Sequence, residues 1–328
     1  MRNIAIMDTS IMSFNIGDQI IMESARRELQ QITKDAFVVN MPTHSPLYHW
    51  YEFSVKSEDG FRKKLNSIDL KFVCGTNLIE KNMMKRKNSW NINLLDTKFF
   101  NGFILVGAGT DGFARIANPY TKKLYNNALS HKFIHSTRDE KTKIFLEDMG
   151  FKAINTGCVT IWPLTKKHCS EIPIKKSDSV VFTITDYAQD ARADQFMINI
   201  LCKHYSNIFC WLQGIEDEAY LKTLNIKYKD KIKFIPSSLE AYNDFLCDND
   251  CDYIGTRLHA GIKAMQMKKR TIIVGVDNRA KDMFNTYNIN LIERNNIGKL
   301  FEFINSEIVT EVAINENRIK KFLNQFNI

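Results

Sequence analysis

Short apolar segments alternate with amphipathic segments along the whole chain, and this pattern constrains the fold more than any single motif. The apolar residues 4–8 are followed by residues 17–32, where Ile20, Ile21 and Leu29 recur with the spacing of one helical face. Strands that alternate with helices of this length predict parallel sheets covered by helices on both faces. We therefore expect an α/β fold.

The same pattern predicts a series of elements in each half of the chain. In the first half the predicted elements are strands at 4–8, 37–40, 71–74, 103–106 and 133–135, and helices at 17–32 and 139–149. In the second half the predicted strands are at 180–185, 207–213, 232–235, 252–254 and 270–276. A long helix is predicted between the first two of these strands, ending at residue 205, and further helices are predicted at 217–225, 239–246, 258–267, 296–305 and 308–326. Residues 81–98 are polar and basic with little periodicity, which predicts a mobile loop.

The length and a polar divider predict two domains. The chain has 328 residues, and single domains commonly have about 100–150. The polar stretch Ile172–Asp178 separates the two series of elements. We expect two doubly wound, Rossmann-like domains facing a cleft, at residues 1–172 and 179–305, with residues 306–328 as a C-terminal helix packing back on the first domain. Ligands of such sheets bind at the carboxyl ends of the strands.

The charge balance favours anionic partners. The chain has 45 Lys and Arg against 37 Asp and Glu, a formal net charge of +8, which suits phosphorylated molecules, nucleic acid or an acidic membrane face. The basic pairs and triplets are scattered, however, whereas a nucleic-acid binder more often concentrates them on one stripe among aromatic residues. We therefore expect no nucleic-acid partner.

The sequence also predicts a cytoplasmic protein. It has no apolar run of about 18 residues, so no membrane-spanning helix is expected, and its N-terminus is charged too early for a signal peptide. The seven cysteines lack a paired framework, which favours a reducing compartment. Cys247 and Cys251 have no companion pair, so we expect no metal site.

The strongest local motif is the segment from Tyr253 to Gly261. A predicted strand ends at Gly255 and a helix begins about three residues later, so Arg257 and His259 lie beside a helix N-terminus. Such an end favours an anion, Arg offers a planar fork for carboxylate or phosphate, and His exchanges protons near neutral pH. The alternative is an Arg that forms a salt bridge within the protein and a His that caps the helix.

Two further loops follow predicted strands. In the first, Gly17 permits close backbone approach and Asp18 could bind a sugar hydroxyl, or Asp18 could cap the helix. The second, residues 107–112, matches G-x-G-x-x-G literally. Pro119 interrupts any long helix starting there, and no acidic residue ends a second strand about twenty residues on, so a dinucleotide site is disfavoured. A glycine-rich substrate loop that includes Gly107 and Gly109 is the better interpretation.

Two other pairs of residues lie at predicted strand ends. Arg138 and Asp139 follow the strand at 133–135, and we expect an Arg–Asp pair that fixes the loop. Arg279 and Lys281 follow the strand at 270–276 and offer two cations. A binding role and a solvated surface are equally compatible with them.

Taken in order, these motifs resemble the polysaccharide pyruvyl transferase family. The matching segments are Asn15-x-Gly17-Asp18, Cys74–Leu78, Arg138–Glu140, Thr156–Cys158 and, most specifically, Gly255–Ala260. The resemblance implies two Rossmann-like domains similar to those of the B-type glycosyltransferases. It also implies transfer of pyruvate from phosphoenolpyruvate onto sugar hydroxyls as a ketal, during synthesis of a cell-surface polysaccharide such as a capsule or exopolysaccharide.

The resemblance also implies roles for individual residues. The family's Arg-Leu-His triplet is associated with the donor, which gives donor-binding roles to Arg257 and Leu258, and we hypothesise that His259 is the catalytic acid/base. Arg279 and Lys281 are assigned to the donor as well. The acceptor-binding residues are expected to be Asn15, Gly17, Asp18, Gly107 and Gly109.

One departure from the family pattern keeps other functions open. A second donor-binding Arg is expected near the start of the second domain, but the sequence has Asp186-Tyr187 there, and the first Arg is Arg192. One alternative is a B-type glycosyltransferase that uses a nucleotide sugar, with Arg257 and Lys281 on the diphosphate. The other is a non-catalytic member of the same fold.

The expected partners follow from the same resemblance. They are phosphoenolpyruvate as co-substrate and a sugar or lipid-linked oligosaccharide as acceptor, with no cofactor and no metal. The surplus of positive charge could also hold the protein peripherally at the inner face of the cell membrane, where lipid-linked sugars reside.

Overall fold

The computed structural model describes residues 1–47, 64–86, 89–110, 116–276 and 285–326. The chain divides into two compact units. The first unit comprises Met1–Ser13, Ile21–Trp162 and Asn315–Ile328, and the second comprises Phe14–Ile20 and Pro163–Ile314. Residues 14–20 and 163–172, which the sequence placed in the first domain, therefore group with the second unit.

The second unit contains a six-stranded parallel sheet within the described residues. Its strands are, in spatial order, β11 (Ile232–Ile235), β10 (Asn207–Trp211), β9 (Ser179–Thr183), β12 (Asp252–Gly255), β13 (Thr271–Gly275) and β14 (Leu291–Glu293). In chain order this sheet reads 3-2-1-4-5-6, the order of a doubly wound dinucleotide-type fold. The order reverses between β9 and β12, so this is the point at which such sheets bind ligands.

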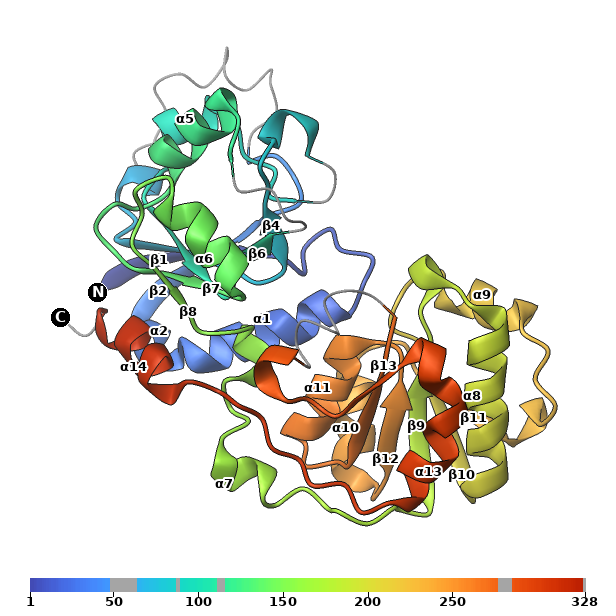
Figure 1. Ribbon diagram of the computed structural model, residues 1–328. Helices are drawn as coiled ribbons and strands as arrows, with labels where there is room; N and C mark the ends of the chain where they lie inside the picture. The colour runs from blue at the N-terminus through green and yellow to red at the C-terminus, as the bar shows by residue number, and fades with distance from the viewer. Residues whose placement is uncertain (48–63, 87–88, 111–115, 277–284, 327–328) are drawn as a thin grey trace. The chain divides into compact units, whose positions relative to one another are not determined.

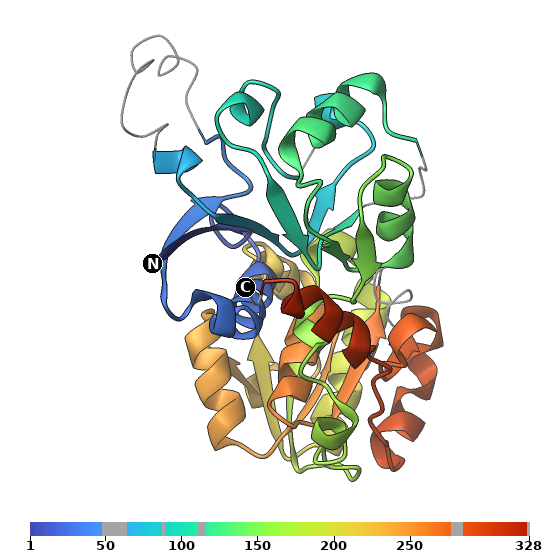
Figure 2. The same cartoon turned by 90° about the vertical axis from the view of Figure 1, so that its left-hand side faces the viewer.

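Helices cover both faces of this sheet (Figures 1 and 2). The larger ones are α8 (Ala191–His204), α9 (Asp217–Thr223), α10 (Leu239–Asp248), α11 (Leu258–Gln266) and α13 (Leu300–Asn305), with a short α7 (Lys166–Cys169) before β9. Met197 of α8 and Leu300 of α13 join the core formed by Phe182 of β9. On the opposite face, Tyr242 of α10 stacks on Trp211 with ring centroids 4.0 Å apart. Both faces are buried, which explains why the strands read as continuous apolar runs.

The first unit has a parallel sheet in the order β2 (Ala36–Pro42), β1 (Arg2–Asp8), β3 (Leu70–Cys74) and β5 (Phe103–Val106). The remaining strands form two short pairs, β7 (His135–Thr137) with β8 (Ala153–Asn155) and β4 (Asn77–Ile79) with β6 (Gly109–Thr110). Its described helices are α2 (Gln30–Thr33), α5 (Pro119–Ala128), α6 (Glu140–Glu147) and α14 (Glu316–Asn324), and α1 (Gly17–Glu28) belongs to this unit from Ile21 onward. The predicted α/β class with parallel sheets is confirmed.

The predicted helix at 308–326 is wrong in its first half. Only α14 is helical there, and the preceding residues run extended, with Ile308 donating to the carbonyl of Ile174. Several β-branched residues between 308 and 312 disfavour a helix, and Asn315 caps the helix that follows. In the first unit, Phe326 packs its ring 5.1 Å from that of Phe72.

Two segments of the first unit have local structure that the sequence did not predict. Within residues 81–98, Met83, Trp90 and Ile92 are buried in the core, and the Trp90 ring lies 4.9 Å from that of Phe103. These buried apolar residues are widely spaced and do not recur with the period of a helix or a strand, so the sequence pattern did not reveal their burial. Pro119 begins α5 rather than interrupting a helix, because the first helical position needs no backbone donor.

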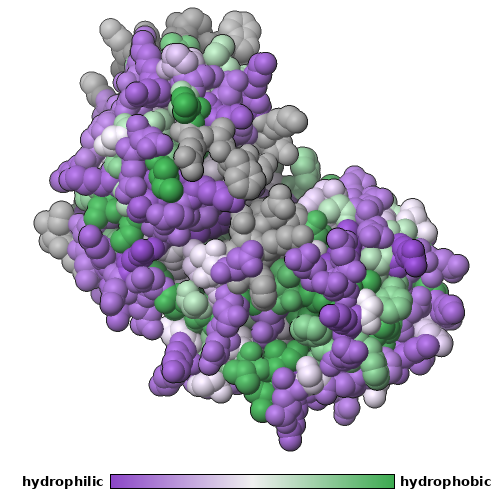
Figure 3. Space-filling model, viewed as in Figure 1, coloured by the Kyte–Doolittle hydropathy of each residue, from purple (hydrophilic) through white to green (hydrophobic). Residues whose placement is uncertain are grey.

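The face shown in Figure 3 is mostly hydrophilic, with hydrophobic patches over the second unit. No helix in the described part of the chain is both long and apolar enough to cross a membrane. All seven cysteines are free thiols, and all except Cys247 are buried.

Candidate functional site

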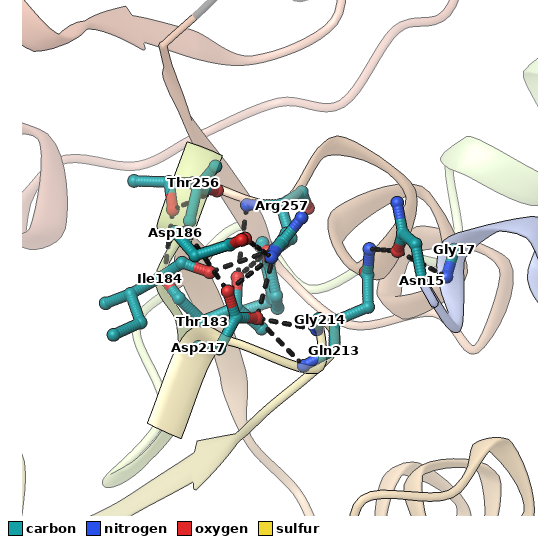
Figure 4. A network of polar contacts seen from close by, with 12 residues as sticks. Asn15, Gly17, Thr183, Ile184, Asp186, Gln213, Gly214, Asp217, Thr256 and Arg257 are labelled. Carbon is teal, nitrogen blue, oxygen red and sulfur yellow. Dashed lines mark hydrogen bonds and ion pairs between the residues drawn. The ribbon is translucent and has the colours of Figure 1, made fainter. Parts of the chain in front are cut away.

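The most elaborate polar network of the second unit lies where its strand order reverses. Figure 4 shows the loops that follow β9, β10 and β12 meeting around one guanidinium group. Asp186 comes from the loop after β9, Gly214 and Asp217 from the loop after β10, and Arg257 from the turn between β12 and α11. The Arg257 motif therefore lies at the edge of the sheet where ligands are expected.

A closed ring of hydrogen bonds fixes the backbone of Arg257. Its N–H donates to Oγ1 of Thr183 at 3.2 Å, the Thr183 and Tyr253 hydroxyls lie 2.6 Å apart, and the Tyr253 hydroxyl donates to the Arg257 carbonyl at 2.7 Å. Gly255 is required beside this ring, because a Cβ there would lie 2.6 Å from the Thr183 nitrogen. The turn is thus tied to the end of β9.

The rest of the motif holds α11 against the sheet. The hydroxyls of Thr256 and Thr185 lie 2.8 Å apart in the interior. A Cβ at Gly261 would lie 2.8 Å from side-chain atoms of both Ile273 and Tyr253. Glycine at this position therefore lets the helix approach the sheet closely, so this part of the motif has a packing cause.

The guanidinium of Arg257 is bound by groups of the protein itself. Its side chain is 3% exposed. Nε donates to the Ile184 carbonyl at 3.0 Å and to Asp217 at 3.2 Å, while Nη2 donates to Asp186 at 2.5 Å and also to Asp217. The Tyr187 ring lies 5.2 Å from the guanidinium carbon. These contacts match the salt-bridged alternative for Arg257, and donor binding by this residue stays a prediction.

Asp217 is the fixed partner of this arginine. It is the first residue of α9 and is completely buried. Besides Arg257, it accepts hydrogen bonds from the backbone nitrogens of Gln213 at 3.1 Å, Gly214 at 2.7 Å and Asp186 at 3.1 Å. Burial raises the pKa of Asp217 and outweighs the lowering effect of the Arg257 charge.

The N-terminus of α11 lies directly beside this network. Arg257 is the N-cap residue, and its side chain makes no capping hydrogen bond, so the positive end of the helix is not neutralised by its own N-cap. Leu258 and His259 form the first turn and are partly buried. The structure thus places His259 two residues from the buried arginine, at a helix end that favours anions.

The predicted acceptor residues near the N-terminus also belong to the second unit. Asn15 Oδ1 accepts from the backbone nitrogen of Gly17 at 2.9 Å and from Nε2 of Gln213 at 2.7 Å, and the Ile16 nitrogen donates to the Gln213 carbonyl at 3.0 Å. Asp18 lies in the first turn of α1, which begins at Gly17, so it is not the N-cap residue. The segment is tied to the loop that holds Asp217.

The predicted glycine loop lies in the first unit. Gly107 has a left-handed backbone with φ of +61° and donates to the Ser136 hydroxyl at 2.9 Å. A Cβ at Gly109 would lie 2.5 Å from the guanidinium carbon of Arg138. Arg138 forms a salt bridge with Asp139 at 3.2 Å, so the predicted Arg–Asp pair is confirmed.

Some assignments of the sequence are not matched by described contacts. Arg279 and Lys281 lie outside the described residues. Among the residues that the structure describes, no group of three or more His, Cys, Asp or Glu could hold a metal ion. Conversely, Asp217 was not predicted as a site residue, and Asp186 was noted only where an Arg was expected. The available signals were the position of Asp186 directly after a predicted strand and that of Asp217 at the start of a predicted helix.

The comparison with protein families decides the classification. The model of the polysaccharide pyruvyl transferase family matches residues 15–278. The chain belongs to this family. The predicted resemblance is thereby confirmed over most of the chain, including the Arg257 motif. A search of curated proteins finds no match.

Solved structures support the fold of this family member. The UDP-GlcNAc 2-epimerase of Methanocaldococcus jannaschii, in complex with UDP-GlcNAc and UDP, has a TM-score of 0.53 and 13% identity, covering 100% of this chain and 99% of that one. The S. aureus protein MnaA with UDP has a TM-score of 0.56 and 11% identity, covering 100% and 96%. Anabaena HepE, with UDP and glucose, has a TM-score of 0.52 and 9% identity, covering 99% and 95%. These identities show the fold alone, which is the predicted B-type glycosyltransferase fold.

Proposed function

We propose that the protein transfers pyruvate from phosphoenolpyruvate onto two hydroxyls of a sugar as a ketal, in the synthesis of a cell-surface polysaccharide. The observation that carries this proposal is the position of Arg257 and the α11 N-terminus, which meet at the reversal point of the second sheet within a motif of the family. Both groups attract anions.

The donor has two anionic groups, a carboxylate and a phosphate, and the site offers two kinds of anion-binding group. Arg257 would bind one group through its planar fork, and the backbone N–H groups that begin α11 would bind the other together with Leu258. Arg279 and Lys281 follow β13 in the sequence and are assigned to the phosphate. Because Asp186 and Asp217 already occupy Nε and Nη2 of Arg257, a donor group that uses these nitrogens requires a change at one of the two carboxylates.

The chemistry needs one proton donor at the reacting carbons. A proton is delivered to the methylene carbon of the donor, and the first sugar hydroxyl adds to the adjacent carbon while losing its own proton. The carbon–oxygen bond to phosphate then breaks, and phosphate leaves with one of the two hydroxyl protons. The second hydroxyl adds at the same carbon to close the ketal, and the other hydroxyl proton restores the proton donor. We assign the proton delivery to His259, which lies in the first turn of α11.

The acceptor assignments stay proposals. Asp18 would bind a sugar hydroxyl, while Asn15 and Gly17 would shape the loop, since Asn15 binds Gln213 and a Cβ at Gly17 would lie 2.8 Å from Nε2 of Gln213. Gly107 and Gly109 are assigned to the acceptor as well. A lipid-linked acceptor would place the protein in the cytoplasm, at the inner face of the membrane.

The direct test is mass spectrometry of candidate acceptors incubated with the protein and phosphoenolpyruvate. An added pyruvate ketal, with release of one phosphate per ketal, is the expected result. Ligand-induced thermal stabilisation gives a second readout, in which UDP is the comparison ligand because the structural neighbours were solved with it. Stabilisation by UDP and not by phosphoenolpyruvate would overturn the proposal in favour of a glycosyltransferase.

A further inference from the structure

The two carboxylates that hold Arg257 differ in how firmly they are held themselves. Asp217 is fully buried and accepts three backbone hydrogen bonds besides those from the arginine. The Asp186 side chain is 23% exposed, accepts from Nη2 of Arg257 and also lies within hydrogen-bonding range of the Asp217 carboxyl group. The backbone of Asp186 is anchored to Asp217 through its N–H, so rotation of its side chain alone would remove one of the two carboxylates from Nη2 while Asp217 still holds the arginine.

The carboxylates around Arg257 outnumber its guanidinium. One guanidinium faces two carboxyl groups, which leaves one unit of negative charge in excess when both of them are ionised. Asp217 alone would neutralise the arginine. The second carboxylate therefore makes the site repel an incoming anion more than Arg257 paired with Asp217 alone would. This electrostatic repulsion is strong where water is largely excluded.

A carboxylate of the protein and a carboxylate of a ligand offer the same two-oxygen fork to a guanidinium. Asp186 occupies the Nη2 position at 2.5 Å, so a ligand that uses this nitrogen must replace it. Replacing Asp217 would instead leave the nitrogens of Gln213 and Gly214 without their acceptor in the interior, which is costly. Asp186 is thus the carboxylate that a ligand can displace from Arg257 at the lower cost.

We propose that Asp186 is an internal competitor of the donor, which occupies Arg257 in the unliganded protein and turns toward solvent when an anionic group binds. The donor's identity rests on the proposed function, but the competition itself concerns any anion at Arg257. The consequence is that Asp186 lowers the affinity for the donor and keeps small anions from filling the site.

The test measures binding of phosphoenolpyruvate and, separately, of inorganic phosphate to the full chain by calorimetry at neutral pH. In Asp186→Asn the shape is kept and the negative charge is lost, so both anions should bind about three- to tenfold more tightly than to the original protein. The control is Asp190→Asn, four residues away. It removes the same charge but keeps the N-cap of α8, since Asn caps as well as Asp.

The outcomes separate this inference from the proposed function. Tighter binding of both anions to Asp186→Asn, with unchanged binding to Asp190→Asn, supports the inference. If phosphate alone binds more tightly to Asp186→Asn, while phosphoenolpyruvate binds no variant, the inference stands and the proposed donor is wrong. Unchanged or weaker binding of both anions to Asp186→Asn overturns it, as does binding of neither. Asp186→Ser provides a second variant, and thermal unfolding shows whether each is folded.

Discussion

The hydroxyl of Tyr253 donates a hydrogen bond of 2.7 Å to the backbone carbonyl of Arg257, four residues further along the chain. The same hydroxyl contacts Thr183, which accepts from the Arg257 nitrogen. A single buried phenol thus joins the last residues of β12 to the end of β9. It fixes the turn from which both Arg257 and His259 project.

Tyr253→Phe should therefore lower both stability and activity. The ring still fills its place, but the Thr183 hydroxyl and the Arg257 carbonyl each lose a partner in the interior, so we expect a loss of about 1–2 kcal/mol in the free energy of unfolding. A turn that is less firmly fixed should reduce kcat about tenfold. Denaturant unfolding and steady-state kinetics measure the two effects.

The matched control is Tyr242→Phe. The Tyr242 hydroxyl is also buried and donates to the Ala260 carbonyl at 3.1 Å, so it binds the first turn of the same helix but not the turn that precedes it. It should cost similar stability and leave kcat near the original value. Equal losses of kcat in both variants would mean that Tyr253 has no particular role in positioning the turn.

His259→Ala should abolish ketal formation while the protein remains folded and still binds phosphoenolpyruvate. The imidazole is the assigned proton donor, and general acid catalysis commonly contributes about 10²–10⁴-fold to the rate. His168→Ala serves as the control in the same unit, because His168 contacts the carbonyl of Met265 and has no assigned role in catalysis. Turnover by His259→Ala at the original rate would remove the assignment.

Arg257→Lys should raise the KM for phosphoenolpyruvate at least about tenfold. A lysine ammonium is a point charge and cannot replace the planar fork that now serves Ile184, Asp186 and Asp217. Arg270→Lys is the control for a buried arginine without a donor role. If both variants change KM to the same degree, the effect of Arg257 is a general loss of structure.

The sequence predicted the helices and strands of the second unit closely. The strand at 232–235 was predicted with its observed bounds, and the helices at 239–246 and 258–267 differ from α10 and α11 by two residues or fewer at each end. These elements are buried on one or both faces, so their apolar residues follow the period of the backbone. Short strands such as β14 lack enough residues to show a period.

The candidate site was only partly predictable, for a physical reason. The Arg257 motif is local, so it was visible in the sequence. The pairing of Arg257 with Asp217 and Asp186 spans 40 and 71 residues. It exists because β9, β10 and β12 are neighbours in the sheet, and the order of strands is not encoded in the spacing of any motif.

Arg270→Met should destabilise the second unit strongly. The Arg270 side chain is 1% exposed and pairs with Asp252 at 2.7 Å, and it also donates to three backbone carbonyls near residue 304. Removing the guanidinium leaves the Asp252 carboxylate buried without its countercharge, which costs about 3–5 kcal/mol. Chemical denaturation gives the magnitude.

A second variant separates this charge effect from lost packing. Arg270→Met combined with Asp252→Leu removes both charges, and it should recover part of the stability lost in the single variant. A double variant that is less stable than Arg270→Met would show that Asp252 is held mainly by Tyr205, which donates to it at 2.6 Å.

His135 should make the stability of the first unit depend on pH. The imidazole is fully buried, Nδ1 accepts from the Leu105 nitrogen at 3.2 Å, and Nε2 contacts the Ser130 carbonyl at 2.9 Å. Because Nδ1 accepts a hydrogen bond, the neutral ring carries its proton on Nε2. Burial lowers the pKa of His135 to about 4, since a charged ring would lose its hydration.

The sign of the effect follows from the two protonation states. In the unfolded chain the pKa of a histidine is about 6.5, so between about pH 6.5 and pH 4 the unfolded chain binds a proton that the folded protein does not. The contribution of the neutral ring is therefore complete above pH 6.5 and is lost as the pH falls toward 4, by about 3 kcal/mol in total. His135→Asn keeps a polar side chain without titrating in this range, so its unfolding free energy should change less between pH 7 and pH 4 than that of the original protein. Parallel curves for the two proteins would contradict a buried neutral His135.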